Sequence, residues 1–429
     1  MWLLTPDRVA AQNVDRPTRA TILAQAQLGA NADAAATARA DEAVEHLNRE
    51  HFGKLAVVAT TTSKYGEKID WVDPHTLDRD FDTRIPPTSA VEQPPVTIEP
   101  PHPTLRLSSM PDDPAYRGPA GKVPILRPNL SFYVNGSSKA ASLSQFLDNI
   151  LKPQPAGRKH LYAGRQDVDF TSPNVGAVAW LNVWNIQQVP SDGMSLAQLA
   201  LAGCLIAPTG NVQETFEFGL QKLPELYGDN NLHIFSYFTT NGYALEGDYI
   251  GGYNRRVQGF VPNTGAYPIG ATIPGPYSSV GGIQYQRRLR IVKSGNAYWL
   301  QDYLSDTAFT NLGYYPVGTA AGQINDHELK SAACRISWFG ETGDKSEADW
   351  AAEDMAGGQF SGGLYGNAGF FRNMINERSS GNVWFSTGAG AMGPVDSACY
   401  TEQGVLAGSG DFTRVLYYGG PGGDAPGCN

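Results

Sequence analysis

Two segments of the chain alternate apolar and polar side chains with a period of two, which is typical of β-strands that bury one face. In residues 212–221, the apolar face consists of Phe216, Phe218 and Leu220. The polar face of this segment consists of Gln213, Thr215, Glu217 and Gln221. In residues 334–341, Cys334, Ile336 and Trp338 share one face, and Arg335, Ser337 and Glu341 share the other. Each predicted strand therefore presents one glutamate, Glu217 or Glu341, on its polar face.

Most of the chain beyond residue 170 has the same short-strand pattern. Further strands are predicted at residues 177–185, 195–201 and 285–292, with turns rich in Gly, Pro and Asn between them. Helical spacing of apolar residues is found at residues 34–51, and an apolar, β-branched run follows at residues 55–60. Many short strands without a β-α-β alternation predict an all-β domain of two stacked antiparallel sheets, preceded by a small α+β region.

Composition narrows the possible functions. At 429 residues the chain is long enough for two units, one of them large. The net charge of −10 argues against a nucleic-acid partner, because nothing would neutralise phosphates. No apolar run approaches the roughly 20 residues of a membrane span. Seven histidines are scattered without metal-ligand spacing, so we expect no metal and no other cofactor.

The two glutamates suggest a hydrolase. Two carboxyl groups that face each other can activate a water molecule, one as the base and the other as the acid. Paired carboxylates also serve glycosidases, and a polar strand face can simply be solvated. The pattern alone leaves these three interpretations open.

Short motifs around the two glutamates resemble the neprosin family of glutamic peptidases. Residues 217–230, EFGLQKLPELYGDN, are similar to the family stretch EAGWQVYPQLYGDN around its first catalytic glutamate, and WFGE at 338–341 is similar to the W-G-G-E string that holds the second. Other matches occur in the family's order. They are NVW at 182–184, FSYFTTNGY at 235–243, GFV at 259–261, IGA at 269–271, WLQ at 299–301, LGYYP at 312–316, MAGGQF at 355–360, FRN at 371–373 and YYGGPG at 417–422.

The resemblance implies a catalytic domain of two curved, stacked antiparallel sheets, with Glu217 and Glu341 as the catalytic pair. Water would attack the peptide carbonyl without a covalent intermediate. Our first assignment makes Glu217 the base and Glu341 the acid, although the sequence does not fix these roles. Gln198, in a strand similar to the family's F-S-L-S-Q, is the first candidate to stabilise the oxyanion, and Tyr237 is the second.

Cleavage after proline is the specificity that the family implies. A pocket for a pyrrolidine ring could be built from aromatic residues, and this chain offers Tyr237, Phe238, Trp299, Tyr314 and Tyr315. Two positions depart from the family pattern and weaken this expectation. Leu220 replaces a tryptophan of the first motif, and Gln359 replaces a histidine of the family's M-G-S-G-H-F. We expect a monomer that acts on peptide or protein substrates, in particular proline-containing ones.

The four cysteines are predicted to fall into two different pairs. Cys399 and Cys428 bracket the Gly- and Pro-rich tail, where the family has a disulfide, so the resemblance implies a bond between them and an oxidising compartment. Cys204 and Cys334 follow or lie on apolar strand faces and are predicted to be buried thiols. A second family disulfide would fall at Gly252 and Val257, which cannot form it.

The resemblance also divides the chain. Residues 1–85 are similar to the family's activation peptide, residues 86–160 to a proline-rich connector and the end of the pro-region, and residues 161–429 to the catalytic sandwich. Twelve of the 29 prolines lie between Pro86 and Pro128, which predicts an extended segment without regular ladder hydrogen bonds. A plain interdomain linker is the alternative for this segment. The division implies a zymogen that acid activates.

The family resemblance implies an extracellular localisation. The first residues, MWLLTP, have too short an apolar stretch for a signal peptide. Either an export signal has been removed or the chain starts internally. Two rival functions remain beside the acid-acting peptidase: a carbohydrate-binding or carbohydrate-cleaving β-sandwich, and a catalytically inactive surface module.

Overall fold

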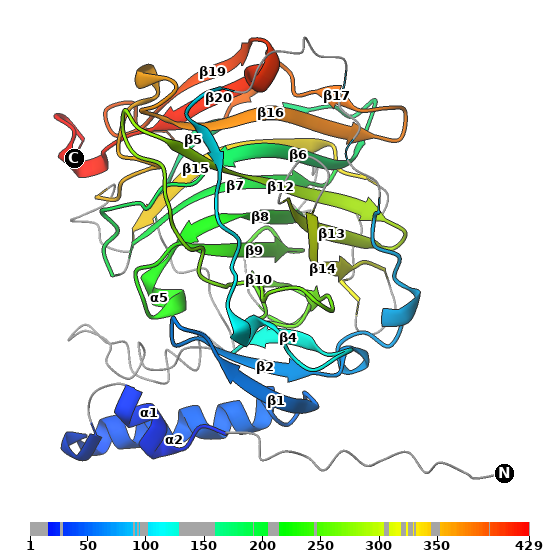
Figure 1. Cartoon of the computed structure of the whole chain (residues 1–429), viewed down its shortest axis with the longest axis vertical. Coiled ribbons are helices and arrows are strands. Elements are labelled where there is room, and N and C mark those ends of the chain that lie inside the picture. The colour runs from blue at the N-terminus through cyan, green and yellow to red at the C-terminus, as the bar shows by residue number, and fades with distance from the viewer. Residues whose placement is uncertain are drawn as a thin grey trace.

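The computed structural model describes residues 16–25, 29–88, 91, 94, 102–127, 159–191, 193–204, 214–243, 247–303, 309–318, 323–324, 329, 332–344, 352–393 and 395–428. Within this part of the chain, a large two-sheet unit is preceded by a smaller α+β unit, which occupies one end of the molecule (Figure 1). No helix in these ranges has both the length and the hydropathy to cross a membrane.

The N-terminal unit combines two helices with a small sheet. Helix α1 (Arg19–Gln25) contacts helix α2 (Ala34–His46), which a π-turn, Leu47–His51, continues. The Asp33 side chain caps α2 by accepting a hydrogen bond from the Ala36 N–H. The helix predicted at residues 34–51 is thus confirmed, and it buries a stripe that includes Ala36, Ala40, Ala43 and Leu47. The antiparallel sheet has the order β1-β2-β4, with β1 at Val57–Thr62, β2 at Lys68–Val72 and β4 at Val123–Leu126.

The first sheet of the large unit has seven strands in the order β10-β9-β8-β7-β15-β5-β18. Their bounds are β5 Lys159–Val168, β7 Met194–Ala202, β8 Thr215–Lys222, β9 His233–Thr239, β10 Gly251–Tyr253, β15 Arg335–Asp344 and β18 Gly390–Ala391. All of the pairings in this sheet are antiparallel. A one-turn helix, α5 (Pro224–Tyr227), follows β8.

The second sheet has the main order β11-β14-β13-β12-β6-β16-β20-β19. The bounds are β11 Val261–Pro262, β14 Phe309–Pro316, β13 Ala297–Tyr303, β12 Gln284–Ser294, β6 Asn174–Asn182, β16 Gly369–Arg378, β20 Arg414–Gly419 and β19 Thr401–Ala407. Two strands lie beside this path, β17 (Val383–Trp384) on β16 and β3 (Leu105–Leu107) on β12. Short 3₁₀ turns are found at Gly29–Asn31, Pro74–Thr76, Phe81–Thr83, Pro114–Tyr116, Ser361–Gly363, Gly410–Phe412 and Gly422–Asp424.

The two sheets are stacked around one continuous apolar core. Phe216 and Phe218 of the first sheet and Tyr298 and Leu300 of the second belong to the same buried cluster. The faces of β8 and β15 that were predicted to be apolar point into this core. The all-β sandwich preceded by a small α+β region is therefore confirmed.

The proline-rich connector forms more ladder hydrogen bonds than its composition predicts. Strand β3 pairs in parallel with β12, and the Ser108 N–H donates to the Gln286 carbonyl at 2.9 Å. Strand β4 also lies in this segment and pairs with β2, although it contains Pro124. The prediction of a segment without regular ladder bonds is likewise wrong for residues 105–107. The reason is that no proline lies between Pro103 and Pro111, so the backbone there keeps its donors. Much of the remaining connector, including residues 95–101 and Pro128, lies outside the described residues.

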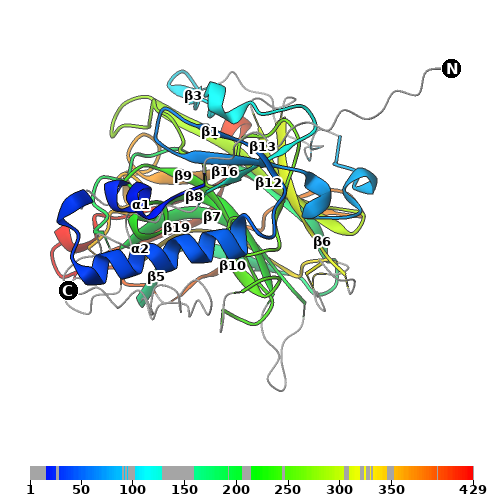
Figure 2. The ribbon, with the colours of Figure 1, turned by 90° about the horizontal axis from the view of Figure 1, so that it is seen from below.

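The N-terminal unit packs against an edge of the sandwich (Figures 1 and 2). Ile69, Trp71 and Tyr116 are buried in the same apolar cluster as the inner faces of the two sheets. The Tyr314 hydroxyl donates to Asp78 at 2.9 Å, which connects the N-terminal unit to the second sheet. Because it completes the core at this edge, the unit is a packed part of the structure.

Both pairs of cysteines form disulfides. The Cys399–Cys428 bond is present, as the family resemblance implied. The prediction that Cys204 and Cys334 are thiols is wrong, because they are bonded to each other with their Cα atoms 4.7 Å apart. Cys204 lies just beyond the end of β7 and Cys334 just before β15. The register of these neighbouring strands, which pairs Ala202 with Arg335, brings the two cysteines together across 130 residues of sequence.

Candidate active site

Glu217 and Glu341 lie on the same face of the seven-stranded sheet. Strand β7 separates their strands and pairs with both of them. Glu217 is opposite Ala200 of β7, and Glu341 is opposite Leu196. Because side chains alternate along a strand, Leu196, Gln198 and Ala200 share one face of β7. The two glutamates therefore flank β7 from opposite sides, with Gln198 between them.

Glu217 is held by two hydroxyl groups. The Tyr243 hydroxyl donates to Glu217 Oε1 at 2.5 Å, and the Thr215 hydroxyl donates to the same oxygen at 3.1 Å. Only 7% of Glu217 is exposed. Burial, together with the charge of Glu341, raises the pKa of Glu217 to about 7, although the hydrogen bonds act in the opposite direction. Glu217 thus remains protonated at pH values where an exposed glutamate is ionised.

Glu341 has a different environment. His160, on β5, places its Nδ1 atom 2.5 Å from Glu341 Oε1. The Gln198 amide donates from Nε2 to Glu341 Oε2 at 3.3 Å. Tyr162 is the residue opposite Glu341 on β5, and the negative charge of Glu341, together with burial, raises the pKa of Tyr162 far above its usual range. Glu341 therefore has an imidazole, an amide and the Tyr162 hydroxyl as its neighbours, whereas the partners of Glu217 are two hydroxyls and the Gln198 amide.

Gln198 is a buried polar residue with spare hydrogen-bonding capacity. Only 1% of the residue is exposed, and its Oε1 atom has no hydrogen-bond partner. The sequence pointed to Gln198 by motif, and the strand register explains its place beside Glu341. An amide here can donate toward an oxygen that lies between the two glutamates.

Tyr237, the second candidate from sequence, lies on β9 opposite Glu217. It is 4% exposed and packs edge-on against Tyr253, with a ring-centroid separation of 4.7 Å. It also stacks on Tyr243 at 5.8 Å. Tyr237, Tyr243 and Tyr253 therefore form an aromatic group at the Glu217 side of the pair.

Trp299 and Tyr314, predicted to bind substrate, do not lie on this face, so the structure does not bring them together with the glutamate pair. They lie on β13 and β14 of the second sheet, pack on each other at 4.6 Å, and contact Leu77 and Phe81 of the N-terminal unit. The physical reason is alternation, because Tyr298 and Leu300 occupy the inner face of β13 and turn Trp299 outward. Phe238 and Tyr315, also considered for the pocket, are buried in the core between the sheets.

Three residues of the site were not predicted from the sequence: His160, Tyr162 and Tyr243. The alternation of His160 and Tyr162 along β5 was a usable signal, but the predicted domain boundary fell at this point. Tyr243 follows Asn-Gly after β9 and adopts a φ of 66°, which is uncommon for a residue with a side chain. Only the folded loop reveals that its hydroxyl reaches Glu217.

The arrangement can perform acid–base chemistry, because the charge of Glu341 acts on Glu217 and helps it to keep its proton. Two neighbouring carboxyls do not both ionise readily, so one is protonated while the other is charged. Among the described residues, no group of three or more His, Cys, Asp or Glu side chains could hold a metal ion. The chemistry that the described side chains themselves offer is the activation of water by a general acid and a general base.

Fold and site together define a two-sheet β-sandwich that carries a buried pair of glutamates. Residues 191–421 match the family model named Neprosin, which is more than half of the chain. The chain belongs to the neprosin family. Glu217, Glu341, Gln198, Tyr237 and Tyr243 all lie within the matched residues, whereas β5, with His160 and Tyr162, precedes them.

Solved structures that match this chain include glutamic peptidases. A scytalido-glutamic peptidase with a transition-state analogue inhibitor matches with 10% identity and a TM-score of 0.31, over 61% of this chain and 98% of its own. SCP-B, a member of the eqolisin family of peptidases, matches with 8% identity and a TM-score of 0.29, over 61% of this chain and 98% of its own. CG-16, a homodimeric agglutinin from chicken liver, matches with 10% identity and a TM-score of 0.20, over 43% of this chain and 93% of its own. The family assignment rests on the family model.

The raised pKa of Glu217 predicts a specific dependence of stability on pH. In the folded chain Glu217 keeps its proton up to about pH 7, whereas the ordinary value is 4.5. Between these values the folded state binds more protons than the unfolded state, so the free energy of unfolding falls as the pH rises through this window. Glu217→Gln removes this penalty, and the variant should be more stable than the wild type by about 3 kcal/mol at pH 8, with little difference at pH 4.

Urea unfolding of the two proteins at several pH values measures this effect. Glu45→Gln is the matched control, because the Glu45 side chain is 76% exposed on α2. Its stability curve should run parallel to that of the wild type. If the stability curve of Glu217→Gln also ran parallel to that of the wild type, this result would contradict the raised pKa of Glu217.

Proposed function

We propose that this chain is a glutamic endopeptidase that hydrolyses peptide bonds with a water molecule activated by Glu217 and Glu341. The observation that carries the proposal is the placement of two buried glutamates on one sheet face, on either side of Gln198. The ionised glutamate takes a proton from water, and the water oxygen attacks the peptide carbonyl. The protonated glutamate then gives its proton to the leaving amine, and no covalent intermediate forms.

The environments of the two glutamates support Glu341 as the base and Glu217 as the acid. Glu217 keeps its proton to about pH 7, and Tyr243 and Thr215 hold one of its oxygens. Glu341 lies beside an imidazole, which favours the ionised carboxylate when it is protonated. This assignment is the reverse of the first assignment from sequence. It predicts an enzyme that works below neutral pH, because Glu217 loses the proton it must donate as the pH rises through 7.

Gln198 and Tyr237 are proposed to assist the pair. The tetrahedral intermediate carries a negative oxygen, which needs a preorganised donor. The Gln198 amide is buried between the glutamates and already points its Nε2 toward Glu341. Tyr237, opposite Glu217, is proposed to provide a second donor, its hydroxyl, and an aromatic wall.

Cleavage after proline is the finer specificity that we propose. The aromatic group of Tyr237, Tyr243 and Tyr253 lies beside Glu217, where one side of a scissile bond would be bound. A pyrrolidine ring is compact and apolar and packs well on such rings. Trp299 and Tyr314 have no part in this proposal.

Mass spectrometry of the products from a peptide library tests activity and specificity together. We expect cleavage at about pH 3 to 5, enriched for proline on the amino side of the cut bond, and none with Glu217→Gln. A parallel incubation with polysaccharides tests the glycosidase alternative. Sugar release without peptide cleavage would overturn the peptidase proposal, and peptide cleavage without proline enrichment would overturn only the specificity.

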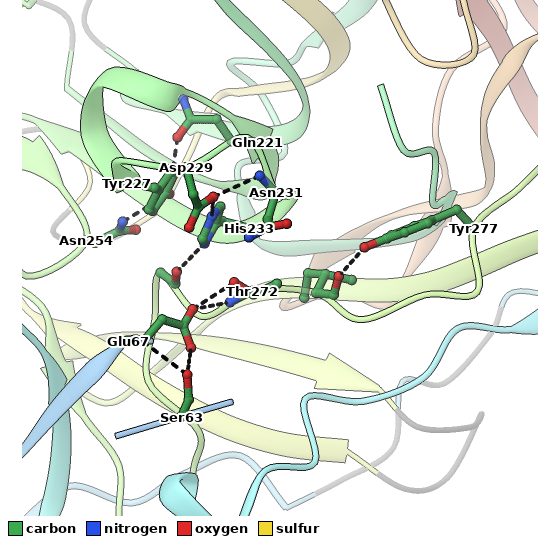
Figure 3. Close-up of polar contacts among 12 residues, drawn as sticks. Ser63, Glu67, Gln221, Tyr227, Asp229, Asn231, His233, Asn254, Thr272 and Tyr277 are labelled. Carbon is green, nitrogen blue, oxygen red and sulfur yellow. Dashed lines mark hydrogen bonds and ion pairs between the residues drawn. The ribbon is translucent and has the colours of Figure 1, made fainter. Parts of the chain in front are cut away.

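We further propose that the N-terminal part is an inhibitory pro-region, comprising residues 1–85 and extending through the connector toward residue 158. Strand β5 begins at Lys159 and carries His160, so a functional cut must precede it. Several contacts between this part and the sandwich depend on carboxylates. Glu67 accepts hydrogen bonds from the Thr272 N–H and hydroxyl, both at 2.8 Å (Figure 3).

The Glu67 contact lies near one end of the strand that carries Glu217. Thr272 pairs with His233 in an isolated bridge, and His233 stacks on Tyr227 at 3.7 Å. The Tyr227 hydroxyl donates to Gln221, which shares a face of β8 with Glu217 (Figure 3). Because carboxylate acceptors hold this contact, acid is proposed to loosen the pro-region.

Acid exposure of the full chain should produce a cut between Pro86 and Lys159 and a rise in activity. The Glu217→Gln protein should remain uncut if the cleavage is autocatalytic. Glu67→Gln, which removes the charged acceptor, should shift the cut toward neutral pH, and Glu45→Gln on the exposed face of α2 should not. Gel electrophoresis after incubation at a series of pH values measures the pH at which the cut appears. Full activity of the uncut chain would contradict the pro-region proposal, and so would equal trimming of the Glu217→Gln protein. Either result would mean that the segment is a linker or an accessory domain.

Secretion and a monomeric state complete the proposal. Two disulfides among the described residues suit an oxidising compartment outside the cell. The proposed chemistry uses groups from this chain alone, so a second copy is not required for the site.

A further inference from the structure

His160 is a neighbour of the glutamate pair whose imidazole can carry a positive charge. Its Nδ1 atom is 2.5 Å from Glu341 Oε1, and its side chain is 35% exposed while that of Glu341 is 10% exposed. Among the described residues, the other titratable or polar groups near Glu341 are Tyr162 on β5, Gln198 on β7 and Glu217 on β8, with Tyr253 on β10 near Tyr162. None of these four is a cation.

We infer that His160 is a positioning residue that keeps Glu341 ionised and oriented as the base of the pair, an inference that rests on the proposed function. Two carboxyls that share one proton need an asymmetry that decides which of them keeps it. Tyr243 and Thr215 hydrogen-bond Glu217, and His160 stands on the opposite side of the pair beside Glu341. An imidazolium at this distance favours the arrangement with the proton on Glu217 and the charge on Glu341.

The exposure of His160 suits this role. Histidine has an ordinary pKa near 6.5, so the ring is protonated at acid pH if burial does not prevent it. With about a third of its side chain exposed, the ring can take up a proton without a large desolvation cost. The ring is also fixed in place, because His160 lies within β5, opposite Gly343 of β15, and stacks on Tyr162 at 6.3 Å.

The kinetic test compares kcat against pH for the wild type, His160→Gln and His160→Lys, with the best-cleaved library peptide. Glutamine keeps a hydrogen-bond donor without a charge, and we expect the acid limb of its profile to move to higher pH by about one unit. This shift corresponds to about a tenfold loss of kcat on that limb. Lysine restores a cation and should move the limb back. A uniform loss of kcat with an unmoved acid limb, or an unchanged profile, would overturn the inference.

A second measurement does not depend on peptidase activity. The imidazole signals of the full-length Glu217→Gln protein, which cannot process itself, are titrated by NMR, and the His160 signal is identified by its loss in His160→Gln. Adding Glu341→Gln should lower the midpoint of the His160 titration by about one pH unit, because the ring loses its anionic partner. His75, which pairs with Asp73 and Asp82 in the N-terminal unit, is the internal control and should not move.

Equal His160 midpoints with and without Glu341 would overturn the inference. A shifted midpoint, combined with a wild-type protein that cleaves no peptide, would instead overturn the proposed function, while the coupling between His160 and Glu341 would stand. The two failures are therefore distinguishable.

Discussion

Replacing Glu217 by glutamine should lower kcat for peptide hydrolysis by about 10²–10⁴-fold, the usual contribution of a general acid or base. Glutamine has nearly the same shape as a protonated glutamic acid and can still accept from Tyr243 and Thr215, so the local structure should survive. What the amide lacks is the proton that the leaving amine requires. The measurement is the steady-state rate on one peptide at about pH 4, with circular dichroism as the check on folding.

Glu341→Gln should cause a loss of the same order, because it removes the proposed base. If the two glutamates act as one unit, the double variant should be hardly slower than either single variant. Glu45→Gln supplies the matched control, since it makes the same chemical change at an exposed position on α2. A glutamate whose glutamine variant keeps more than about a tenth of the activity has no general acid–base role.

Removing the Cys204–Cys334 disulfide should destabilise the catalytic domain strongly. The bond closes a loop of 130 residues, for which the chain-entropy estimate is about 5 kcal/mol, compared with about 4 kcal/mol for the 29-residue loop of Cys399–Cys428. Cys204 and Cys334 lie at one end of β7 and β15, the strands that carry Gln198 and Glu341. The Cys204→Ser, Cys334→Ser variant should therefore also lose activity at temperatures where the wild type is stable.

The midpoint of urea unfolding, measured for this variant and for the matched Cys399→Ser, Cys428→Ser variant, tests the prediction. The midpoint should fall further for the first than for the second. An equal or smaller decrease for the first variant would show that loop length does not govern the contribution of these bonds. Full reduction of the wild type breaks both bonds and should lower the midpoint at least as far as the first variant does.

Some features of the site could be predicted because they depend on local pattern. The alternation along residues 212–221 and 334–341 assigned the core and polar faces of β8 and β15, and the motifs around Glu217 and Glu341 indicated the family. Gln198 was found in the same way. These inferences hold because a strand's two faces are determined by its own residues.

Other features could not be predicted because they depend on which strands are neighbours. Trp299 and Tyr314 have the aromatic character of a substrate pocket, but β13 and β14 belong to the other sheet. Cys204 and Cys334 looked like buried thiols, because nothing in either local sequence records that β7 and β15 are paired. His160 was placed at a domain boundary, although β5 lies beside β15.

The sequence by itself determined the all-β class, the polar strand faces that carry the two glutamates, and membership of the neprosin family. Only the tertiary structure decided that Glu217 has hydroxyls as its partners and Glu341 has an imidazole. The physical reason is that strand pattern is set by neighbours two residues apart, whereas the proton affinity of a carboxyl is set by burial and by charges brought from distant parts of the chain. His160 and Glu341 are 181 residues apart in sequence, and their contact exists only in the folded sheet.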